Sequence, residues 1–291
     1  MIAPPDPRLT ALAERSLARP ADAAARALAA RLASRPGAAA VLFYGARLRA
    51  PDRPGLIDLY VLTTGDADWH GPGLGALANR LLPPTVLHER PGDLDAAAKV
   101  AVIRLDAFRS RMRRGSWDAT LWARFAQPAA LLEAKDAATA QAVAEAVAEG
   151  WRTAAWWADR LPHDGDRWRG LFAATYGAEL RPEGAARPGD VAAADPGLRA
   201  EIDRLLPPVT PTAAETAAAR RAWARRRAAG RALNALRLVK AAFTFRGGAA
   251  YAISKLERHA GPEALSPWER RAPWAAAPVV LWRLLRGRGR R

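Results

Sequence analysis

The first third of the chain alternates short apolar runs with polar connections that contain proline and glycine, the pattern of β-strands joined by turns. Four apolar runs predict strands at residues 41–44, 56–62, 85–89 and 99–105. A helix rich in alanine and leucine is predicted at 21–34, and a second helix, at 71–82, is ended by Pro83-Pro84. The pattern therefore predicts a small mixed α/β sheet with one crossover helix.

From residue 106 onward the helical pattern dominates. The periodicity predicts helices at 136–161, 167–180, 213–245 and 249–259, followed by a final stretch after Pro267. The segment 181–211 is rich in proline, glycine and alanine, which is typical of a linker or an irregular loop with at most one short helix. The change of pattern predicts a boundary near residue 135 between a sheet-containing head and a helical body.

The composition limits the kinds of site and segment that the chain can contain. With 291 residues, half of them apolar, the chain is long enough to bury a substantial core. It has no cysteine, which excludes disulfides, a thiolate zinc site and a thiol nucleophile, and which fits a reducing cytoplasm. The N-terminus lacks a basic start followed by an apolar segment, and no run of about 18 apolar residues occurs. The sequence therefore predicts neither a signal peptide nor a spanning helix.

The positive charge is concentrated near the C-terminus. Of a formal net charge of +16, most lies in residues 211–291, which hold 18 Lys and Arg against 4 Asp and Glu. Such a block attracts polyanions, and the common ones are nucleic acid and an anionic membrane surface. The whole chain uses arginine far more than lysine, with four lysines in all, so a GC-rich genome is the alternative explanation.

One carboxylate stands inside an otherwise apolar strand. Asp58 lies in the second predicted strand, and the first predicted strand ends in the turn Tyr44-Gly45-Ala46. A glycine turn lets the backbone approach phosphates, and a carboxylate on the next strand can hold Mg²⁺ that bridges phosphate oxygens. Polymerase-β-like nucleotidyltransferases have this layout. The bare pattern also fits a simple turn glycine and an edge-strand carboxylate.

Four blocks of sequence resemble the mitochondrial-type phosphatidate cytidylyltransferases and follow the order of that family. The first block joins the Tyr44-Gly45-Ala46 turn, the Asp58 strand and the segment 66–70. The second holds KVAVIRLDAF (99–108) and WDATLWARFAQPAALL (117–132), the third is YGAELR (176–181), and the fourth is FRGGAAYAISKLER (245–258). Together the blocks cover most of residues 40 to 260.

The resemblance implies an α+β fold with three parts. These are a polymerase-β-like nucleotidyltransferase head with a mixed sheet (1–135), a helical second domain (136–260) and a basic amphipathic membrane-docking tail (261–291). It also implies a reaction, the Mg²⁺-dependent transfer of a cytidylyl group from CTP to phosphatidic acid, which gives CDP-diacylglycerol and pyrophosphate. Such an enzyme of phospholipid biosynthesis would be cytoplasmic and peripherally associated with the inner face of the cell membrane.

Roles for single residues follow from the same resemblance. Asp58 is implied as the catalytic carboxylate and Mg²⁺ ligand, and Glu179 stands where the family has an aspartate that would be a second metal ligand. Lys99 opens the matched strand, and its ammonium is implied to neutralise triphosphate charge. The nucleotide-binding residues that the resemblance implies are Tyr44, Gly45, Ala46, Arg47 and Arg181.

Two positions depart from the family pattern. Ala46 replaces a serine, so phosphate binding would depend on backbone amides and on the nearby Arg47 and Arg49. Tyr60 stands two residues after Asp58, where many nucleotidyltransferases carry a second carboxylate on the same strand face. A further acidic ligand must then come from elsewhere in the chain.

Other polar residues have simpler interpretations. Asp66 and Asp68 are local alternatives as metal ligands, but both have the sequence context of solvated loop acids. His70 could contact nucleotide by resemblance, or it could belong to the start of the following helix. His163-Asp164 is expected to be a solvated loop pair, because no second histidine lies at helical ligand spacing.

Tryptophan occurs in two groups. The first is expected in the core or, alternatively, in a belt at a membrane interface, and consists of Trp151, Trp156, Trp157 and Trp168. The second lies in SPWERRAPWAAAPVVLWRLLRGRGRR, whose apolar run of about ten residues is too short to span a bilayer but suits an interfacial helix. The residues expected to contact the membrane are Trp268, Trp274, Trp282, Arg283 and Arg286.

Two other functions stay open on the residues alone. One is a nucleotidyltransferase that acts on RNA or another polyanion, and the other is a non-catalytic, membrane-associated relative. The basic residues of the tail are mixed with Trp, Val and Leu, as in interfacial helices, and no RNA-binding signature is present. The sequence therefore favours a membrane surface over nucleic acid.

Overall fold

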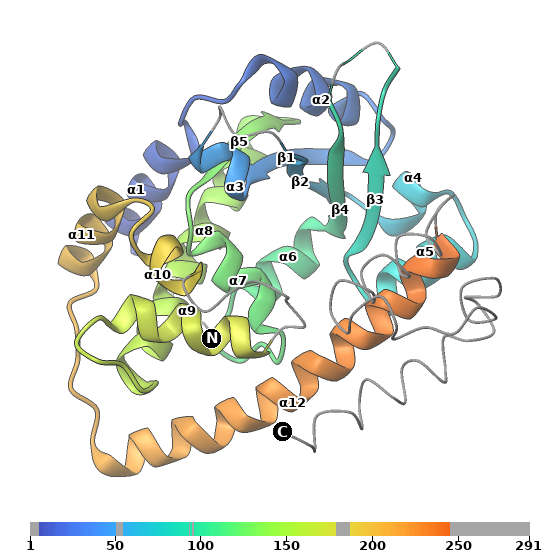
Figure 1. The fold of residues 1–291 in the computed structure, drawn as a ribbon. Helices are drawn as coiled ribbons and strands as arrows, with labels where there is room; N and C mark the ends of the chain where they lie inside the picture. Colours follow the sequence, from blue (N-terminus) through green and yellow to red (C-terminus); the bar gives the residue numbers. More distant parts are fainter. Residues whose placement is uncertain (1–5, 51–54, 93, 95, 179–186, 245–291) are drawn as a thin grey trace.

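The computed structural model describes residues 6–50, 55–92, 94, 96–178 and 187–244 (Figure 1). Two predicted site residues, Glu179 and Arg181, lie outside these ranges, and so do the predicted helix 249–259 and the tail 261–291. The predicted membrane contacts therefore also lie outside the described residues; they are Trp268, Trp274, Trp282, Arg283 and Arg286.

Five strands form one mixed sheet in the order β3-β4-β2-β1-β5. The strands are β1 (Ala38–Tyr44), β2 (Ile57–Thr63), β3 (Thr85–Glu89), β4 (Ala98–Arg104) and β5 (Ala129–Ala134). β2 and β4 pair in parallel, whereas β1 pairs antiparallel with β2 and with β5, and β3 pairs antiparallel with β4. The expected α+β fold with a mixed sheet is confirmed.

The sequence predicts four of these strands but not β5. Its residues, AALLEA, include strong helix formers and lie in a region where the helical pattern dominates. Pairing with β1, in which Leu131 lies opposite Leu42, nevertheless makes this segment an edge strand. Tertiary pairing overrides the local preference here.

Twelve helices are found among the described residues. They are α1 (Pro7–Leu17), α2 (Ala23–Ala33), α3 (Ala46–Arg49), α4 (Asp66–His70), α5 (Leu74–Leu81), α6 (Leu105–Arg111), α7 (Ala119–Phe125), α8 (Ala137–Arg160), α9 (Arg167–Ala178), α10 (Arg187–Ala192), α11 (Pro196–Leu205) and α12 (Ala213–Thr244). The five helices predicted within the described ranges, at α2, α5, α8, α9 and α12, are confirmed.

The interpretation of 181–211 as a linker with at most one short helix is wrong. Within this segment the structure describes both α10 and α11. Pro196 occupies the start of α11, where its missing N–H costs nothing, and Asp195 caps the helix by accepting a hydrogen bond from the backbone N–H of Leu198 at 3.0 Å. Leu198 and Ile202 are then buried in the core. Proline and glycine here mark helix boundaries rather than a loop.

The sheet has a hydrophobic core on each face. Alternate residues of β1, β2 and β4 point to opposite sides, so that Phe43 and Leu59 enter one core and Leu42 and Tyr60 enter the other. The smaller core lies under α2, and the larger core lies under α1, α6, α7 and α8 (Figure 1). The larger core takes residues from both sides of residue 135, and the domain boundary near that residue stays a prediction.

The tryptophans of the helical part belong to this larger core. Trp151, Trp157 and Trp168 are buried, and Trp156 is partly buried against the same cluster. The indole N–H of Trp151, on α8, donates to the carbonyl oxygen of Phe125 at 2.9 Å and so fixes α8 against α7. The interpretation of these residues as core residues is confirmed.

Candidate active site at one end of the sheet

Four side chains form a row across one face of the sheet. Tyr44 of β1 lies opposite Asp58 of β2, Asp58 lies beside Lys99 of β4, and Lys99 lies opposite His88 of β3. In the next row inward the corresponding positions are apolar or aromatic, such as Leu42 and Tyr60. The polar row therefore marks the edge of the larger core, at the end of the sheet where β1 ends and β2 and β4 begin.

Gly45 is in contact with the Asp58 carboxylate. This glycine ends β1 with φ at 93°, a conformation that residues with a side chain rarely adopt. A Cβ atom added at Gly45 would lie 2.6 Å from Asp58 Oδ2. Glycine is therefore required both for the turn and for the close approach of the carboxylate to the backbone just before α3.

Asp58 and Lys99 form a loose ion pair. Lys99 Nζ lies 4.0 Å from Asp58 Oδ1, and the two side chains are 31% and 26% exposed. No hydrogen bond to Asp58 is found within the described residues. An exposed pair of this kind contributes little to stability. The lone pairs of the Asp58 carboxylate are thus accessible to a ligand rather than occupied by the protein.

Tyr60, two residues after Asp58, belongs to an aromatic cluster; in many nucleotidyltransferases a second carboxylate stands at this spacing. Tyr60 is buried, its hydroxyl accepts a hydrogen bond from Arg124 Nη1 at 3.3 Å, and its ring lies 5.3 Å from that of Tyr44. The Arg124 guanidinium carbon also lies 5.4 Å from the centre of the Tyr44 ring. A cation therefore stands beside the row where a carboxylate would otherwise extend a metal site.

The two arginines after the turn make different contacts. Arg47 is bonded to the Asp22 carboxylate, at 3.2 Å, and to the Gly55 carbonyl oxygen, at 3.3 Å. Arg49 donates to Gln127 Oε1 at 3.2 Å, which ties α3 to the segment before β5. Arg47 is thus tied to the N-cap of α2, and its role as a nucleotide ligand stays a prediction, as does that of Ala46 at the start of α3.

Asp66 is not a solvated loop acid. It is 8% exposed on α4, accepts a hydrogen bond from Asn79 Nδ2 at 2.7 Å and lies 3.8 Å from Arg104 Nη1. Folding of the loop into α4 turns it inward, whereas Asp68 stays exposed as expected. α4 follows the C-terminal end of β2, whereas Asp58 lies near the N-terminal end of β2. The structure therefore does not bring Asp66, Asp68 or His70 to the row.

His70 and His163 have structural surroundings that differ. His70 ends α4 and is half-buried, and its burial lowers the pKa of the imidazole. His163 is exposed, and its neighbour Asp164 pairs with Arg169, so the expectation of a solvated loop pair is confirmed.

The residues present fit a magnesium ion that is bound mainly by substrate. Among the described residues no three His, Asp or Glu side chains gather closely enough to hold a metal ion. Mg²⁺ commonly keeps several waters and is held by one or two carboxylates together with substrate phosphates. The accessible, hydrogen-bond-free carboxylate of Asp58 suits the role of that single ligand, and the predicted second ligand, Glu179, lies outside the described residues.

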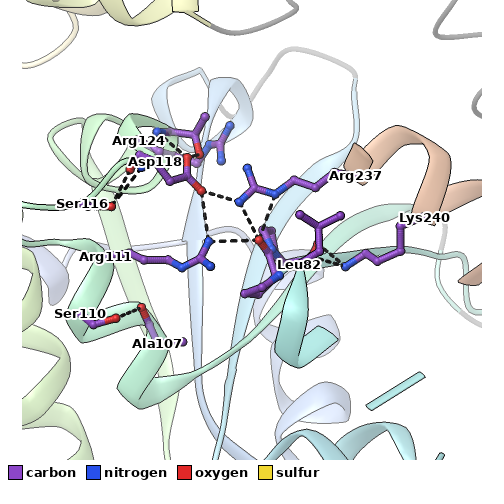
Figure 2. Close-up of polar contacts among 12 residues, drawn as sticks. Leu82, Ala107, Ser110, Arg111, Ser116, Asp118, Arg124, Arg237 and Lys240 are labelled. Atoms are coloured by element: carbon purple, nitrogen blue, oxygen red, sulfur yellow. Dashed lines mark hydrogen bonds and ion pairs between the residues drawn. The ribbon is translucent and has the colours of Figure 1, made fainter. Parts of the chain in front are cut away.

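A second group of charges lies buried where α12 packs against the turn between α5 and β3 and the N-cap of α7 (Figure 2). Asp118 accepts hydrogen bonds from Arg111, at 3.2 Å, and from Arg237 of α12. Both guanidinium groups also donate to the carbonyl oxygen of Pro83, and Lys240 Nζ donates to the carbonyl oxygen of Leu82 at 2.6 Å. These bonds fasten α12 to the turn between α5 and β3. We call this group the α12 latch.

The latch perturbs the titration of its members. Burial raises the pKa of Asp118, but Arg237 and Arg111 outweigh that effect and hold the pKa below its usual value. Burial lowers the pKa of Lys240 to about 7, and the charges of Arg237 and Arg111 act in the same direction. The latch is therefore a cation-rich cluster whose single carboxylate is fully engaged.

Sequence reasoning missed two features of this region. The first is His88. The predicted strand 85–89 places His88 on one face of the sheet and so could have pointed to it, but only the pairing with β4 brings it beside Lys99. The second is the latch. It joins residues more than a hundred positions apart, such as Asp118 and Arg237, so no local sequence pattern predicts it.

Comparisons with known proteins add no identification. No protein-family model matches the chain, and no match was found among curated proteins. Within the described residues, none of the helices combines the length and apolar character that a bilayer-crossing segment requires.

Proposed function

We propose that the protein is a Mg²⁺-dependent nucleotidyltransferase that transfers a cytidylyl group from CTP to phosphatidic acid at the cytoplasmic face of the membrane. One observation carries the proposal: Gly45, Asp58 and Lys99, which lie far apart in the sequence, meet at one end of the sheet. The choice of CTP and phosphatidic acid rests on the family resemblance of the four sequence blocks.

The chemistry of the three residues suits phosphoryl transfer. Asp58 would hold the metal ion, and the ion, when bound, would neutralise charge on the triphosphate. Lys99 Nζ, 4.0 Å from Asp58 Oδ1, would add a cation on the neighbouring strand and so favour the departure of pyrophosphate. Gly45 keeps the backbone close to the carboxylate without a side chain between them.

The acceptor needs little activation. The phosphate monoester of phosphatidic acid is already an anion at neutral pH, so it can attack the α-phosphorus of CTP without a strong general base. The row accordingly needs to position the two substrates and to balance their negative charge. The cation of Lys99 lies beside Asp58, and that of Arg124 lies over the ring of Tyr44 in the same row, which suits such a task.

The direct test is a reaction with defined substrates. The purified protein is incubated with phosphatidic acid vesicles, Mg²⁺ and each of the four nucleoside triphosphates separately, and the lipid product and pyrophosphate are measured. We expect CDP-diacylglycerol from CTP alone. Asp58→Asn should lower the rate on the order of 10³-fold because it removes the charged metal ligand, whereas Asp68→Asn, at an exposed acid beyond the other end of β2, should leave the rate unchanged.

Three results would contradict the proposal. No lipid product with any triphosphate would reject the enzyme assignment, and an unaffected Asp58→Asn variant would reject the site. Nucleotide addition to an RNA end, without a lipid product, would instead assign a nucleotidyltransferase that acts on nucleic acid.

A further inference from the structure

The helix α5 is amphipathic in the reverse of the usual sense. Its leucines point to solvent: Leu74, Leu77 and Leu81 are 85%, 50% and 73% exposed. Its buried residue is polar: Asn79 is fully buried, and its Oδ1 accepts hydrogen bonds from the backbone N–H and hydroxyl of Thr85, both at 2.8 Å. The hydrogen bonds of Asn79 thus orient the helix with its leucines outward.

The three leucines form one stripe. At about 100° per residue, they fall within roughly 60° of one another around the helix axis, and Asn79 lies roughly 170° from the middle of the stripe. Single exposed leucines are common on proteins, but a contiguous stripe on a helix that is fixed by a buried polar contact marks a surface with a partner. The partner must present an apolar layer.

An exposed cation lies beside the stripe. Arg80 is exposed and flanks it on α5 itself. The C-terminal part of α12 packs beside the end of α5, since Arg237 and Lys240 bond to the carbonyl oxygens of Pro83 and Leu82 (Figure 1). Four more exposed arginines, which pair with no carboxylate among the described residues, lie ten or more positions before Arg237 on α12 and add to the positive charge of that helix without bordering the stripe; they are Arg220, Arg221, Arg225 and Arg227.

We propose that the Leu74–Leu77–Leu81 stripe of α5 docks the protein on an anionic phospholipid bilayer. An apolar stripe with the exposed Arg80 beside it, on a chain with a net charge of +16, matches the acyl layer and the anionic headgroups of such a surface. A second copy of the chain fits less well, because its net charge of +16 would bring like charges together around the same face. The proposal rests on the proposed function in taking the lipid surface to be the one that holds the substrate.

The test measures binding to vesicles that contain phosphatidic acid. The variant Leu74→Ser/Leu77→Ser/Leu81→Ser is compared with the unaltered chain by flotation, with Val209→Ser as a control at an exposed apolar residue elsewhere (56% exposed). We expect the triple variant to bind on the order of tenfold more weakly or worse, and the control to bind like the unaltered chain. Because the leucines are exposed, thermal unfolding and molecular mass should not change.

Each other outcome overturns the proposal. Unchanged vesicle binding shows that the stripe does not face lipid. A fall in thermal stability with unchanged vesicle binding shows that the rest of the chain covers the stripe, and a dimer that becomes a monomer shows that a second copy does.

Activity assays separate this proposal from the proposed function. With a short-chain, water-soluble phosphatidic acid, the triple variant should keep its turnover, while Asp58→Asn should lose turnover and keep vesicle binding. Lipid product without leucine-dependent binding would reject the docking face alone, and leucine-dependent binding without lipid product would reject the enzyme alone.

Discussion

The two polar groups of the molecule, the row at the end of the sheet and the α12 latch, contain the same kinds of residues in opposite states. In the row, Asp58 is 26% exposed and meets its cation Lys99 at 4.0 Å. In the latch, the Asp118 side chain is 7% exposed and accepts hydrogen bonds from both Arg111 and Arg237. A carboxylate that is saturated by the protein stabilises the fold, whereas one left accessible can bind a ligand.

The difference also explains why residue type alone does not identify a site. Both carboxylates lie near arginine or lysine in the folded protein. What separates them is the number of hydrogen bonds that the folded chain supplies, since a buried carboxylate must be compensated and a half-exposed one need not be.

The largest effect is expected in the latch. Asp118→Asn keeps the cap of α7 but leaves Arg111 and Arg237 without a carboxylate, so we expect a loss of about 3 kcal/mol in the free energy of unfolding. Urea unfolding measures it. Asp136→Asn is the matched control, because Asp136 is an exposed N-cap of α8 and Asn caps equally well. Equal changes in the two variants would mean that the latch does not stabilise the fold.

The next effect is expected at the turn of the row. Gly45→Ala would place a methyl group 2.6 Å from Asp58 Oδ2 at a positive φ, and we expect a loss of about 1–3 kcal/mol in unfolding free energy together with lower CTP-dependent activity. Gly71→Ala is the control, since Gly71 also has a positive φ but no atom within 4 Å of the added methyl. If both variants lose the same stability and keep activity, Gly45 matters only for the backbone conformation.

A smaller, pH-dependent effect is expected at Lys240. Its pKa is about 7 in the folded protein against an ordinary 10.5. Between these values the unfolded chain binds a proton that the folded chain does not, so this group makes stability rise with pH, by at most about 1.4 kcal/mol per pH unit. The facing charges of Arg237 and Arg111 oppose its protonation, and that of Asp66 favours it.

Unfolding at pH 7, 8 and 9 tests this linkage. Lys240→Met should flatten the rise with pH that the unaltered protein shows, whereas Lys135→Met, at an exposed lysine, should leave it in place. A rise that persists in Lys240→Met would assign it to other groups.

The smallest effect is expected at His88. The side chain is exposed at the end of the row, where water competes for any hydrogen bond to a ligand, so His88→Ala should raise the KM for CTP about two- to fivefold and leave kcat and stability unchanged. Steady-state kinetics with His163→Ala as the control measures it. An equal change in both variants would place His88 outside the site.

Four of the five strands and five of the twelve described helices follow from local pattern. Strand alternation and the helical period predict the sheet strands up to β4 and the long helices, because burial on one face imposes those periods. β5 escapes this reasoning, and so do seven of the twelve described helices, among them α10 and α11. β5 is a helix-prone segment held by its neighbour β1, whereas α10 and α11 have proline and glycine at their starts.

The site is predictable in part. The sequence singles out Asp58, because a carboxylate inside an apolar strand requires an explanation. It also predicts the glycine turn that ends the preceding strand. Asp66 shows where prediction from local sequence fails. Its sequence context is that of a loop acid, but it becomes buried once α4 forms and Asn79 donates a hydrogen bond to it.

By itself, the sequence determined the alternating strands, the long helices, the charge block of the last quarter and the candidate carboxylate, because these depend on residue type and spacing along the chain. The tertiary structure alone decided that Lys99 stands between Asp58 and His88, that Arg237 fastens α12 to Asp118, and that the leucines of α5 face outward. The physical reason is that pairing register and hydrogen-bond saturation depend on partners distant in sequence, and no local pattern contains them.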